Sequence, residues 1–278
     1  MSGPNTISVE KLLRLIGTAK CPLIIDVRIR DDYDLDQRFL PGAIKLDHAG
    51  ISQNGFDRSL LPYKDAPCVV VCQRGAKLSH SVAALLRLAG VEAASLDGGF
   101  EAWRDAKAAL VPQQLLPARG NSGATRWVTR QRPKIDRIAC PWLIRRFVDH
   151  RAAFMFVQAD QVDDIASRFD AVAFDMPEGF WTHRGTGCTF DTMIQEFGLD
   201  MEPLTRMAEI IRAADTGRLE DNKQAAGLVA ISLGLSRQFS DDLEQLEAGM
   251  VVYDALYRWC RDAVEETHSW PSSTKVVA

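Results

Sequence analysis

The sequence lacks any segment that would place the chain in or across a membrane. No apolar run reaches the roughly 18 residues that a transmembrane helix requires, although 46% of the 278 residues are hydrophobic. The N-terminus, residues 1–13, has no basic stretch followed by an apolar core, so it does not have the form of a secretory signal. The sequence therefore predicts a cytoplasmic protein without a membrane partner.

Net positive charge is absent from the chain as a whole, and cysteine is sparse. The 33 Lys and Arg residues are outnumbered by 37 Asp and Glu, so a net charge of −4 gives no overall attraction to nucleic acid or to an anionic membrane. The six cysteines are scattered and form no Cys-x-x-Cys pair. In a chain of this length, that pattern indicates free thiols in a reducing compartment rather than a disulfide framework.

The first part of the chain has strands that alternate with helices. Apolar runs predict strands at 22–27, 68–71 and 93–96, and helical spacing predicts helices at 7–16, 78–90 and 100–109. This alternation is typical of parallel strands in a layered sheet. We therefore expect residues 1–110 to form one α/β domain with a parallel sheet.

The alternation ends at residues 111–125, which are rich in proline, glycine and polar residues and which we interpret as a linker. Residues 126–266 are expected to form a second, mainly α domain with a small sheet. Helices are predicted at 141–148, 204–214, 224–233 and 241–261, and short strands at 154–157 and 171–174. Residues 267–278 are expected to be a flexible tail.

Cys72 follows the apolar run 69–71 and opens a tight polar loop before the next predicted helix. The loop amides and the positive end of that helix would face the sulfur, and both stabilise a thiolate. This order predicts that Cys72 is a nucleophile. The alternative is an inert packing thiol, which is our interpretation of Cys21 and Cys68. A Cys–His pair between Cys72 and His80 is conceivable, but a surface histidine is the simpler interpretation.

Four segments of residues 6–110, taken together, resemble a single rhodanese domain. They are a strand with an Asp-x-Arg ending, a Pro-Gly-Ala segment, a six-residue loop and a Gly-Gly-x-x-x-Trp element, at 23–28, 40–44, 72–77 and 97–103. The chain departs from the family pattern at Lys77, where the common loop carries Arg, and at Leu78, where it carries Ser or Thr. Because Lys cannot bind an oxyanion through two parallel hydrogen bonds, we expect thiosulfate to be a poor donor.

The resemblance implies a thiosulfate-type sulfurtransferase that requires no cofactor for sulfur transfer. Cys72 would accept sulfur as a persulfide from thiosulfate or another small anionic donor, and would pass it to a thiol or to cyanide. Its substrate-binding residues would be Gln73, Arg74, Gly75, Ala76 and Lys77 of the loop, with Asp26 and Arg28. Gly75 would allow the backbone torsions of this tight loop.

Positive charge, scarce overall, is concentrated at residues 119–146, where the sequence has eight basic residues and one acidic residue. This segment carries +7 against −4 for the whole chain, so the remainder carries −11. Three partners are consistent with it: a small tetrahedral oxyanion such as chromate or sulfate, the phosphates of nucleic acid, or the acidic remainder of the chain. The candidates for oxyanion binding are Arg132, Lys134, Arg137, Arg145 and Arg146.

A second group of polar residues, which includes Asp175, surrounds a glycine-rich turn at residues 184–187. Histidine, cysteine and aspartate at short spacing bind transition metals, and a distant acid could complete the set in space. The metal candidates are His183, Cys188, Asp191 and Asp215. Because the segment has no Cys-x-x-Cys or His-x-x-x-His pair, the alternative is a capped turn in which Asp191 opens the next helix.

Residues 126–262 resemble the ChrB-type chromate-resistance domain. The resemblance rests on a long block at 132–147 and on shorter blocks at 183–185, 188–191, 214–217 and 246–250. It implies a link to chromate resistance or to chromate-responsive transcription. Two functions remain: a sulfurtransferase linked to oxyanion resistance, and a chromate-responsive DNA-binding regulator with a rhodanese-like sensor. The retained loop cysteine favours the first, and the lack of an obvious helix-turn-helix weakens the second.

Overall fold

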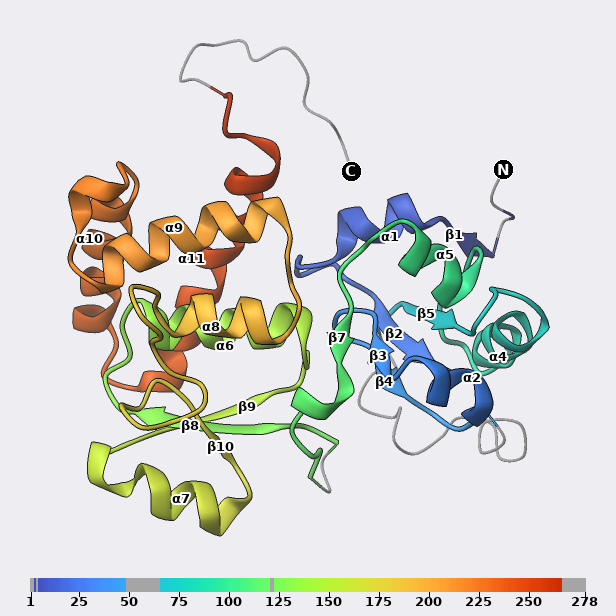
Figure 1. Cartoon of the computed structure of the whole chain (residues 1–278), viewed down its shortest axis with the longest axis horizontal. Coiled ribbons are helices and arrows are strands. Elements are labelled where there is room, and N and C mark those ends of the chain that lie inside the picture. The colour runs from blue at the N-terminus through green and yellow to red at the C-terminus, as the bar shows by residue number, and fades with distance from the viewer. Residues whose placement is uncertain (1–2, 4, 49–65, 121–122, 267–278) are drawn as a thin grey trace.

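The computed structural model describes residues 3, 5–48, 66–120 and 123–266. The chain folds into two lobes that lie side by side, with strand β7 (Val111–Pro112) running between them (Figure 1). The predicted tail, 267–278, lies outside the described residues. Within the described residues, none of the helices combines the length and the apolarity needed to cross a membrane.

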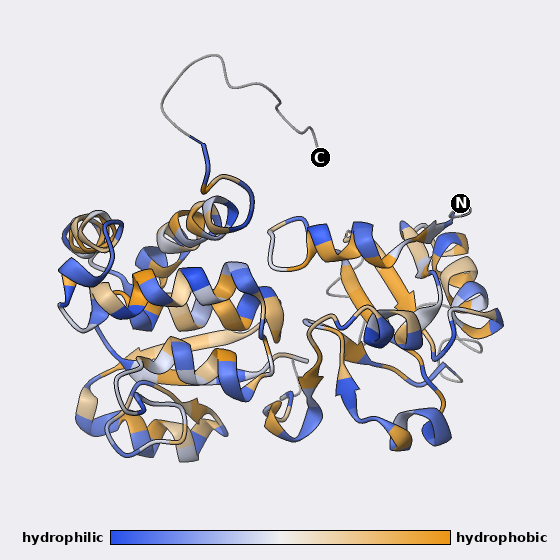
Figure 2. Cartoon of the chain, turned by 45° about the horizontal axis from the view of Figure 1, so that its top comes forward, coloured by the Kyte–Doolittle hydropathy of each residue, from blue (hydrophilic) through white to orange (hydrophobic). Residues whose placement is uncertain are grey.

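A parallel five-stranded sheet forms the centre of the N-terminal lobe. Its order is β1–β6–β5–β2–β4, and each neighbouring pair is parallel. The strands are β1 (Thr6–Ile7), β2 (Leu23–Asp26), β4 (Ile44–Lys45), β5 (Cys68–Val71) and β6 (Ala93–Leu96). Strands β2 and β5 are buried over their whole length, as expected for a sheet covered on both faces, and their apolar character is visible in Figure 2.

Helices cover both faces of this sheet. They are α1 (Val9–Leu15), α2 (Arg30–Leu35), α4 (Lys77–Leu88) and α5 (Gly99–Asp105). Leu12 of α1 and Trp103 of α5 pack in one core cluster with Val69, whereas Leu86 of α4 packs on the other face with Val70. The predicted α/β domain with a parallel sheet is therefore confirmed.

The C-terminal lobe is mainly helical and contains a parallel sheet of order β10–β8–β9. Its strands are β8 (Arg126–Arg130), β9 (Ala153–Val157) and β10 (Val172–Ala173). Its helices are α6 (Asp136–Phe147), α7 (Val162–Phe169), α8 (Thr189–Glu196), α9 (Glu202–Asp215), α10 (Ala225–Gln238) and α11 (Asp242–Asp262). Helix α6 lies at the centre, and its side chains Trp142, Leu143 and Phe147 are fully buried. The mainly α fold with a small sheet is confirmed.

The segment expected as a linker begins with regular structure. Strand β7 pairs antiparallel with β3 (Arg38–Phe39) of the N-terminal lobe, and a single 3₁₀ turn, Gln113–Leu115, follows it. The placement of a domain boundary at 111–125 stays a prediction, but its first residues are not free of structure, because Val111 is buried in the core.

The two lobes are joined by apolar packing and by hydrogen bonds. Ile16 of the N-terminal lobe shares a core cluster with Phe147 and Tyr257 of the C-terminal lobe. The Gly42 N–H donates to the Phe147 carbonyl oxygen at 2.7 Å, and the Arg261 side chain donates to the Arg14 carbonyl oxygen at 3.0 Å.

Candidate functional site

Cys72 lies where β5 ends, at the base of the loop that leads into α4. Its residue exposure is 5%, and its thiol donates to Ser79 Oγ over 3.1 Å. The Ala76 N–H donates to Cys72 Sγ at 3.3 Å. The loop therefore curls around the sulfur, as the order of strand, thiol, loop and helix predicts. Ser79, a buried contact from the first turn of α4, was not among the predicted site residues, and only the three-dimensional fold brings it to the sulfur.

The shape of the loop depends on close contact with the turn before α5. The Phe100 N–H donates to the Cys72 carbonyl oxygen at 3.0 Å, and the Glu101 N–H donates to the Gln73 carbonyl oxygen at 3.0 Å. Gly75 has φ +61°, and a Cβ there would lie 2.5 Å from Gly98 N. Only glycine satisfies both the torsion and the spacing at this position. The Cys72 loop and the segment around Gly98 are therefore packed directly against each other.

The polar side chains of the loop differ in whether they have a partner within the protein. Gln73 Nε2 donates to Glu101 Oε1 at 3.1 Å, and Arg74 Nε lies 3.5 Å from the same oxygen. Lys77 is exposed and forms no ion pair with any of the residues described. Lys77 is therefore the loop cation whose charge is available to an anionic donor, while the charge of Arg74 is partly balanced by Glu101.

Asp26 and Arg28 lie outside the loop, in a buried ion pair, so the structure gives their side chains no open route to a substrate. Their side chains are 2% and 0% exposed and form an ion pair of 2.7 Å. The guanidinium also donates to the carbonyl oxygens of Asp36 and Arg38 and lies 3.8 Å from the centre of the Phe100 ring. This pair holds the segment after β2 against the protein interior, so its role is structural.

The histidine that follows the loop makes no contact with the sulfur. His80 is exposed on α4, and none of the interactions found within the described part of the chain joins it to Cys72. This agrees with the interpretation of His80 as a surface residue.

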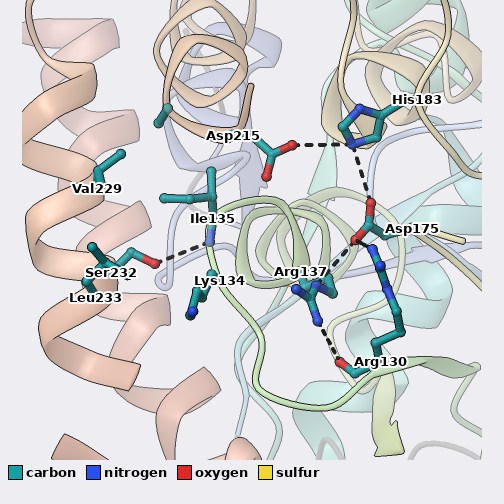
Figure 3. Close-up of a pocket in the computed structure, with 11 residues that line it drawn as sticks. Arg130, Lys134, Ile135, Arg137, Asp175, His183, Asp215, Val229, Ser232 and Leu233 are labelled. Atoms are coloured by element: carbon teal, nitrogen blue, oxygen red, sulfur yellow. Dashed lines mark hydrogen bonds and ion pairs between the residues drawn. The ribbon is translucent and has the colours of Figure 1, made fainter. Parts of the chain in front are cut away.

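A second group of ionisable side chains lies in the C-terminal lobe, around His183. Its Nε2 atom is 3.5 Å from Asp136 Oδ2, 3.4 Å from Asp175 Oδ1 and 3.3 Å from Asp215 Oδ2. Figure 3 shows Asp175 and Asp215 pointing toward the ring from different elements. These four side chains, called the His183 cluster below, come from α6, α9 and two loops.

The surroundings of the His183 cluster raise the pKa values of two of its members, His183 and Asp215. Interaction with the Asp136 carboxylate raises the pKa of His183 to about 9, against the opposing effect of burial. Burial raises the pKa of Asp215 to about 6, and the charge of Asp136 contributes in the same direction. The cluster therefore holds a histidine and an acid that both have raised pKa values, and perturbed values of this kind are common at functional sites.

Two of the four metal candidates, His183 and Asp215, belong to this cluster, and the other two do not. Cys188 and Asp191 form the cap of α8, in which the Cys188 N–H donates to Asp191 Oδ2 at 2.8 Å. Cys188 is fully buried, and that burial raises the pKa of its thiol far above its ordinary value. For these two residues the capped turn, rather than the metal site, is what the structure contains.

Asp136 was not predicted as a site residue, although it is the single acid of the basic segment. It lies 47 positions before His183, at the start of α6, and its position among arginines is the only signal in the sequence. Asp175 was noted beside His183 but was not among the metal candidates.

The basic segment does not form one surface. Arg145 pairs with Glu247 at 2.6 Å, Arg146 pairs with Asp254 at 2.8 Å, and Arg132 donates to carbonyl oxygens at the end of α10. Lys134 and Arg137, by contrast, line a cavity beside the His183 cluster. The predicted oxyanion candidates are thus divided, and only Lys134 and Arg137 reach that cavity.

This cavity has a volume of about 380 Å³ and contains charges of both signs. Arg130, Lys134 and Arg137 supply the cationic side, and Asp175, His183 and Asp215 supply the other side (Figure 3). Arg130 Nη2 lies 3.0 Å from Asp175 Oδ2, and Arg137 Nε lies 3.3 Å from it. The cavity can therefore accept an anion, a cation or both.

Comparison with known proteins gives two family matches: a rhodanese-like domain over residues 8–106 and the C-terminal domain of ChrB over residues 127–260. Protein ChrB of Cupriavidus metallidurans is 35% identical over 133 residues, which are 47% of this chain and 39% of that protein. Thiosulfate sulfurtransferase GlpE of Shewanella oneidensis is 31% identical over 108 residues, which are 39% of this chain and 100% of that protein.

Among solved structures, a rhodanese-like domain protein from Staphylococcus aureus is 25% identical, with a TM-score of 0.29; the match covers 36% of this chain and 90% of that one. The chain spans about two fifths of the length of the ChrB relative. It spans all of GlpE, which shows the family of the N-terminal lobe. The chain belongs to the rhodanese-like family, the family of the sulfurtransferases, through its N-terminal lobe, and its C-terminal lobe is similar to the C-terminal domain of ChrB.

Proposed function

We propose that this chain is a sulfurtransferase that carries sulfane sulfur as a persulfide on Cys72. The observation that supports it most directly is the Ala76 N–H that donates to Cys72 Sγ at 3.3 Å, inside a loop fixed by the turn before α5. A fixed amide aimed at the sulfur stabilises the charge that develops there, without reorganisation during the reaction. The match to a thiosulfate sulfurtransferase over its full length supports the same chemistry.

The proposed reaction has two displacement steps. The Cys72 thiolate, having lost its proton to solvent, attacks the outer sulfur of a donor such as thiosulfate. The S–S bond of the donor breaks, and sulfite leaves with the electron pair. A thiolate or cyanide then attacks the outer sulfur of the persulfide, and the Cys72 thiolate is released. No metal or other cofactor is needed in either step.

Intact-mass spectrometry of the purified full-length chain tests this proposal. After incubation with thiosulfate or with a protein persulfide, the wild type is expected to gain one sulfur, about 32 Da, and Cys72→Ala is expected to gain none. Cys68→Ala, which removes a buried thiol of the same strand, is the matched control and should load as the wild type does. A wild type that stays unloaded with both donors, or a Cys72→Ala chain that loads, would contradict the proposal.

The identity of the donor depends on Lys77. An exposed lysine offers an anion a single point charge, whereas arginine offers two parallel hydrogen bonds. Lys77→Arg is therefore expected to raise kcat/KM for thiosulfate by roughly three- to tenfold, since a second charge-assisted hydrogen bond contributes about 1 kcal/mol. Steady-state assays with thiosulfate and cyanide measure this effect. The exposed Lys11→Arg change is the control, and an unchanged kcat/KM in Lys77→Arg would show that the donor does not contact this position.

We further infer that the C-terminal domain links this chemistry to resistance against tetrahedral oxyanions such as chromate. Its similarity to protein ChrB suggests the association. The cavity beside the His183 cluster supports it, because Arg130, Lys134 and Arg137 line one side, and guanidinium groups bind oxyanions well.

A further inference from the structure

Three members of the His183 cluster, Asp136, Asp175 and His183, place ligand atoms within 4.8 Å of one another, and Asp215 approaches the group through His183. Three carboxylate oxygens surround a single nitrogen, His183 Nε2, at 3.3, 3.4 and 3.5 Å. These distances exceed those of good N–H···O hydrogen bonds, about 2.7–3.2 Å. One imidazole N–H also cannot serve three acceptors. Ligands at about 2.1 Å from a shared tetrahedral ion are separated by about 3.4 Å, and the three nitrogen–oxygen distances here match that separation.

Outer contacts already fix two of the carboxylates in place. Asp136 accepts from the N–H groups of Thr189 and Phe190, at 2.6 and 3.1 Å, so the first turn of α8 orients its two oxygens. Asp175 accepts from Thr189 Oγ1 at 3.0 Å on the oxygen that faces His183, and its other oxygen faces Arg130. Hydrogen bonds of this kind orient the ligands of metal sites and hold them ready for the ion.

Asp215 lies beside two other carboxylates, and His183 is the charged group that offsets part of their repulsion. Asp215 is the last residue of α9, where the helix dipole opposes negative charge. Asp136 and Asp175 lie close enough to repel it further. A divalent cation among the three carboxylates would compensate each of these interactions.

The cavity provides the independent sign of a ligand. The cavity, of about 380 Å³, is lined by Asp175, His183 and Asp215. An ion can therefore reach the cluster from the cavity, and its coordination positions on the cavity side would stay open. Lys134 lines the same cavity and forms no ion pair with any described residue. An anion bound to the metal would contact this ammonium group, which gives the otherwise unpaired charge a partner.

We propose that Asp136, Asp175, His183 and Asp215 bind one divalent transition-metal ion of the class Mn²⁺, Fe²⁺ or Zn²⁺. One imidazole nitrogen and three carboxylate oxygens suit these borderline and hard ions rather than thiolate-seeking ions. Three of these residues already satisfy the geometry of a shared site, with donor atoms within 4.8 Å of one another. This site is separate from Cys72, and sulfur transfer does not depend on it.

Metal titration of the full-length chain tests the proposal. Protein stripped with a chelator is titrated with Mn²⁺, and free Mn²⁺ is followed by its paramagnetic resonance signal; Zn²⁺ binding is measured by calorimetry. We expect one ion bound per chain and a rise in Tm when the ion is present. Mn²⁺ is the more informative probe, because the six free thiols bind it poorly.

Variants then assign the bound ion to this site. His183→Gln and Asp215→Asn are expected to weaken Mn²⁺ binding at least about tenfold, since each removes one ligand. The exposed residues His80 and Asp163 provide matched controls, His80→Gln and Asp163→Asn, which should bind as the wild type does. A wild type that binds neither ion, or cluster variants that bind with wild-type affinity, would overturn the proposal.

The same preparation separates metal binding from the other two proposals. Persulfide loading of His183→Gln, measured by intact mass, should equal that of the wild type, so a failed sulfurtransferase leaves the metal result unaffected. Sulfate binding to the wild type but not to Lys134→Ala would support the oxyanion proposal. Equal sulfate binding by the wild type and Lys134→Ala would oppose the oxyanion proposal. The Mn²⁺ stoichiometry would not be affected by that result, because it is measured separately.

Discussion

Arg28→Met is expected to lower the free energy of unfolding by about 3–5 kcal/mol, because it leaves a buried charge without its partner. The Asp26 and Arg28 side chains are 2% and 0% exposed. The substitution also removes the donors to the carbonyl oxygens of Asp36 and Arg38, at 2.8 and 2.7 Å. Unfolding in urea, followed by far-ultraviolet circular dichroism, measures the effect.

The control for this prediction is Arg14→Met, which removes an ion pair of the same type at the surface. Arg14 and Glu10 are 71% and 75% exposed, so we expect a change of no more than about 0.5 kcal/mol. A double variant, Asp26→Leu with Arg28→Met, should be less destabilised than Arg28→Met alone, since no unpaired charge remains. Arg28→Met within about 1 kcal/mol of the wild type would show that the pair does not hold this segment.

The sequence predicts the elements of the N-terminal lobe well where burial makes them apolar. The strands Cys68–Val71 and Ala93–Leu96 have the predicted bounds, because both are short apolar runs between breaking residues. Strand β8 (Arg126–Arg130) was missed because its first and last residues are both arginine. Only the three residues between them are buried, which is too short an apolar run to predict a strand. Helix α7 (Val162–Phe169) was missed as well, although its four apolar residues recur at helical spacing, because eight residues are too short a window to separate a helix from a polar loop.

The candidate site residues divide along the same physical line. Cys72 was predicted because strand, thiol and loop are consecutive in the sequence, so local order determines the geometry. The burial of Asp26 and Arg28 was not foreseen, because the sequence does not show that their side chains pair in the interior. Cys188 lies five positions after His183 yet outside its cluster, whereas Asp136 lies 47 positions before His183 and within it. Spacing along the chain therefore failed where tertiary packing decides which side chains meet.

The Cys72 loop and the His183 cluster are built on opposite lobes and share no residue. The loop is held by β5, α4 and α5, whereas the cluster is held by α6, α8 and α9. The lobes nevertheless share a core cluster, which contains Ile16 of one lobe and Phe147 and Tyr257 of the other. A substitution at this junction should therefore alter the stability of the chain while the two sites keep their separate chemistries.

Gly99→Ala is expected to abolish most sulfur loading on Cys72 and to lower the free energy of unfolding by about 2–5 kcal/mol. A Cβ at Gly99 would lie 2.2 Å from the Cys72 carbonyl oxygen and 2.3 Å from Gly75 N, and both are backbone atoms that cannot move independently. The positive φ of +60° adds about 1–2 kcal/mol of strain, and the overlap adds about 1–3 kcal/mol. Because the Phe100 N–H holds the Cys72 carbonyl oxygen at 3.0 Å, the displaced turn carries Cys72 with it.

The rate of persulfide formation in Gly99→Ala should fall by about 10²-fold or more, the usual cost of moving a reacting group by about 1 Å. Gly90→Ala is the matched control, because Gly90 also has a positive φ, +83°. No atom lies within 4 Å of the position that a Cβ would take there, so the substitution introduces backbone strain without steric overlap. We expect Gly90→Ala to lose about 1–2 kcal/mol of stability and to load sulfur at the wild-type rate. The loading rates of the wild type, Gly99→Ala and Gly90→Ala are compared by stopping the reaction at set times and measuring intact mass. If Gly99→Ala loaded as fast as Gly90→Ala, contact between the turn and the loop would not position Cys72, and the sulfur would depend on α4 alone for its geometry.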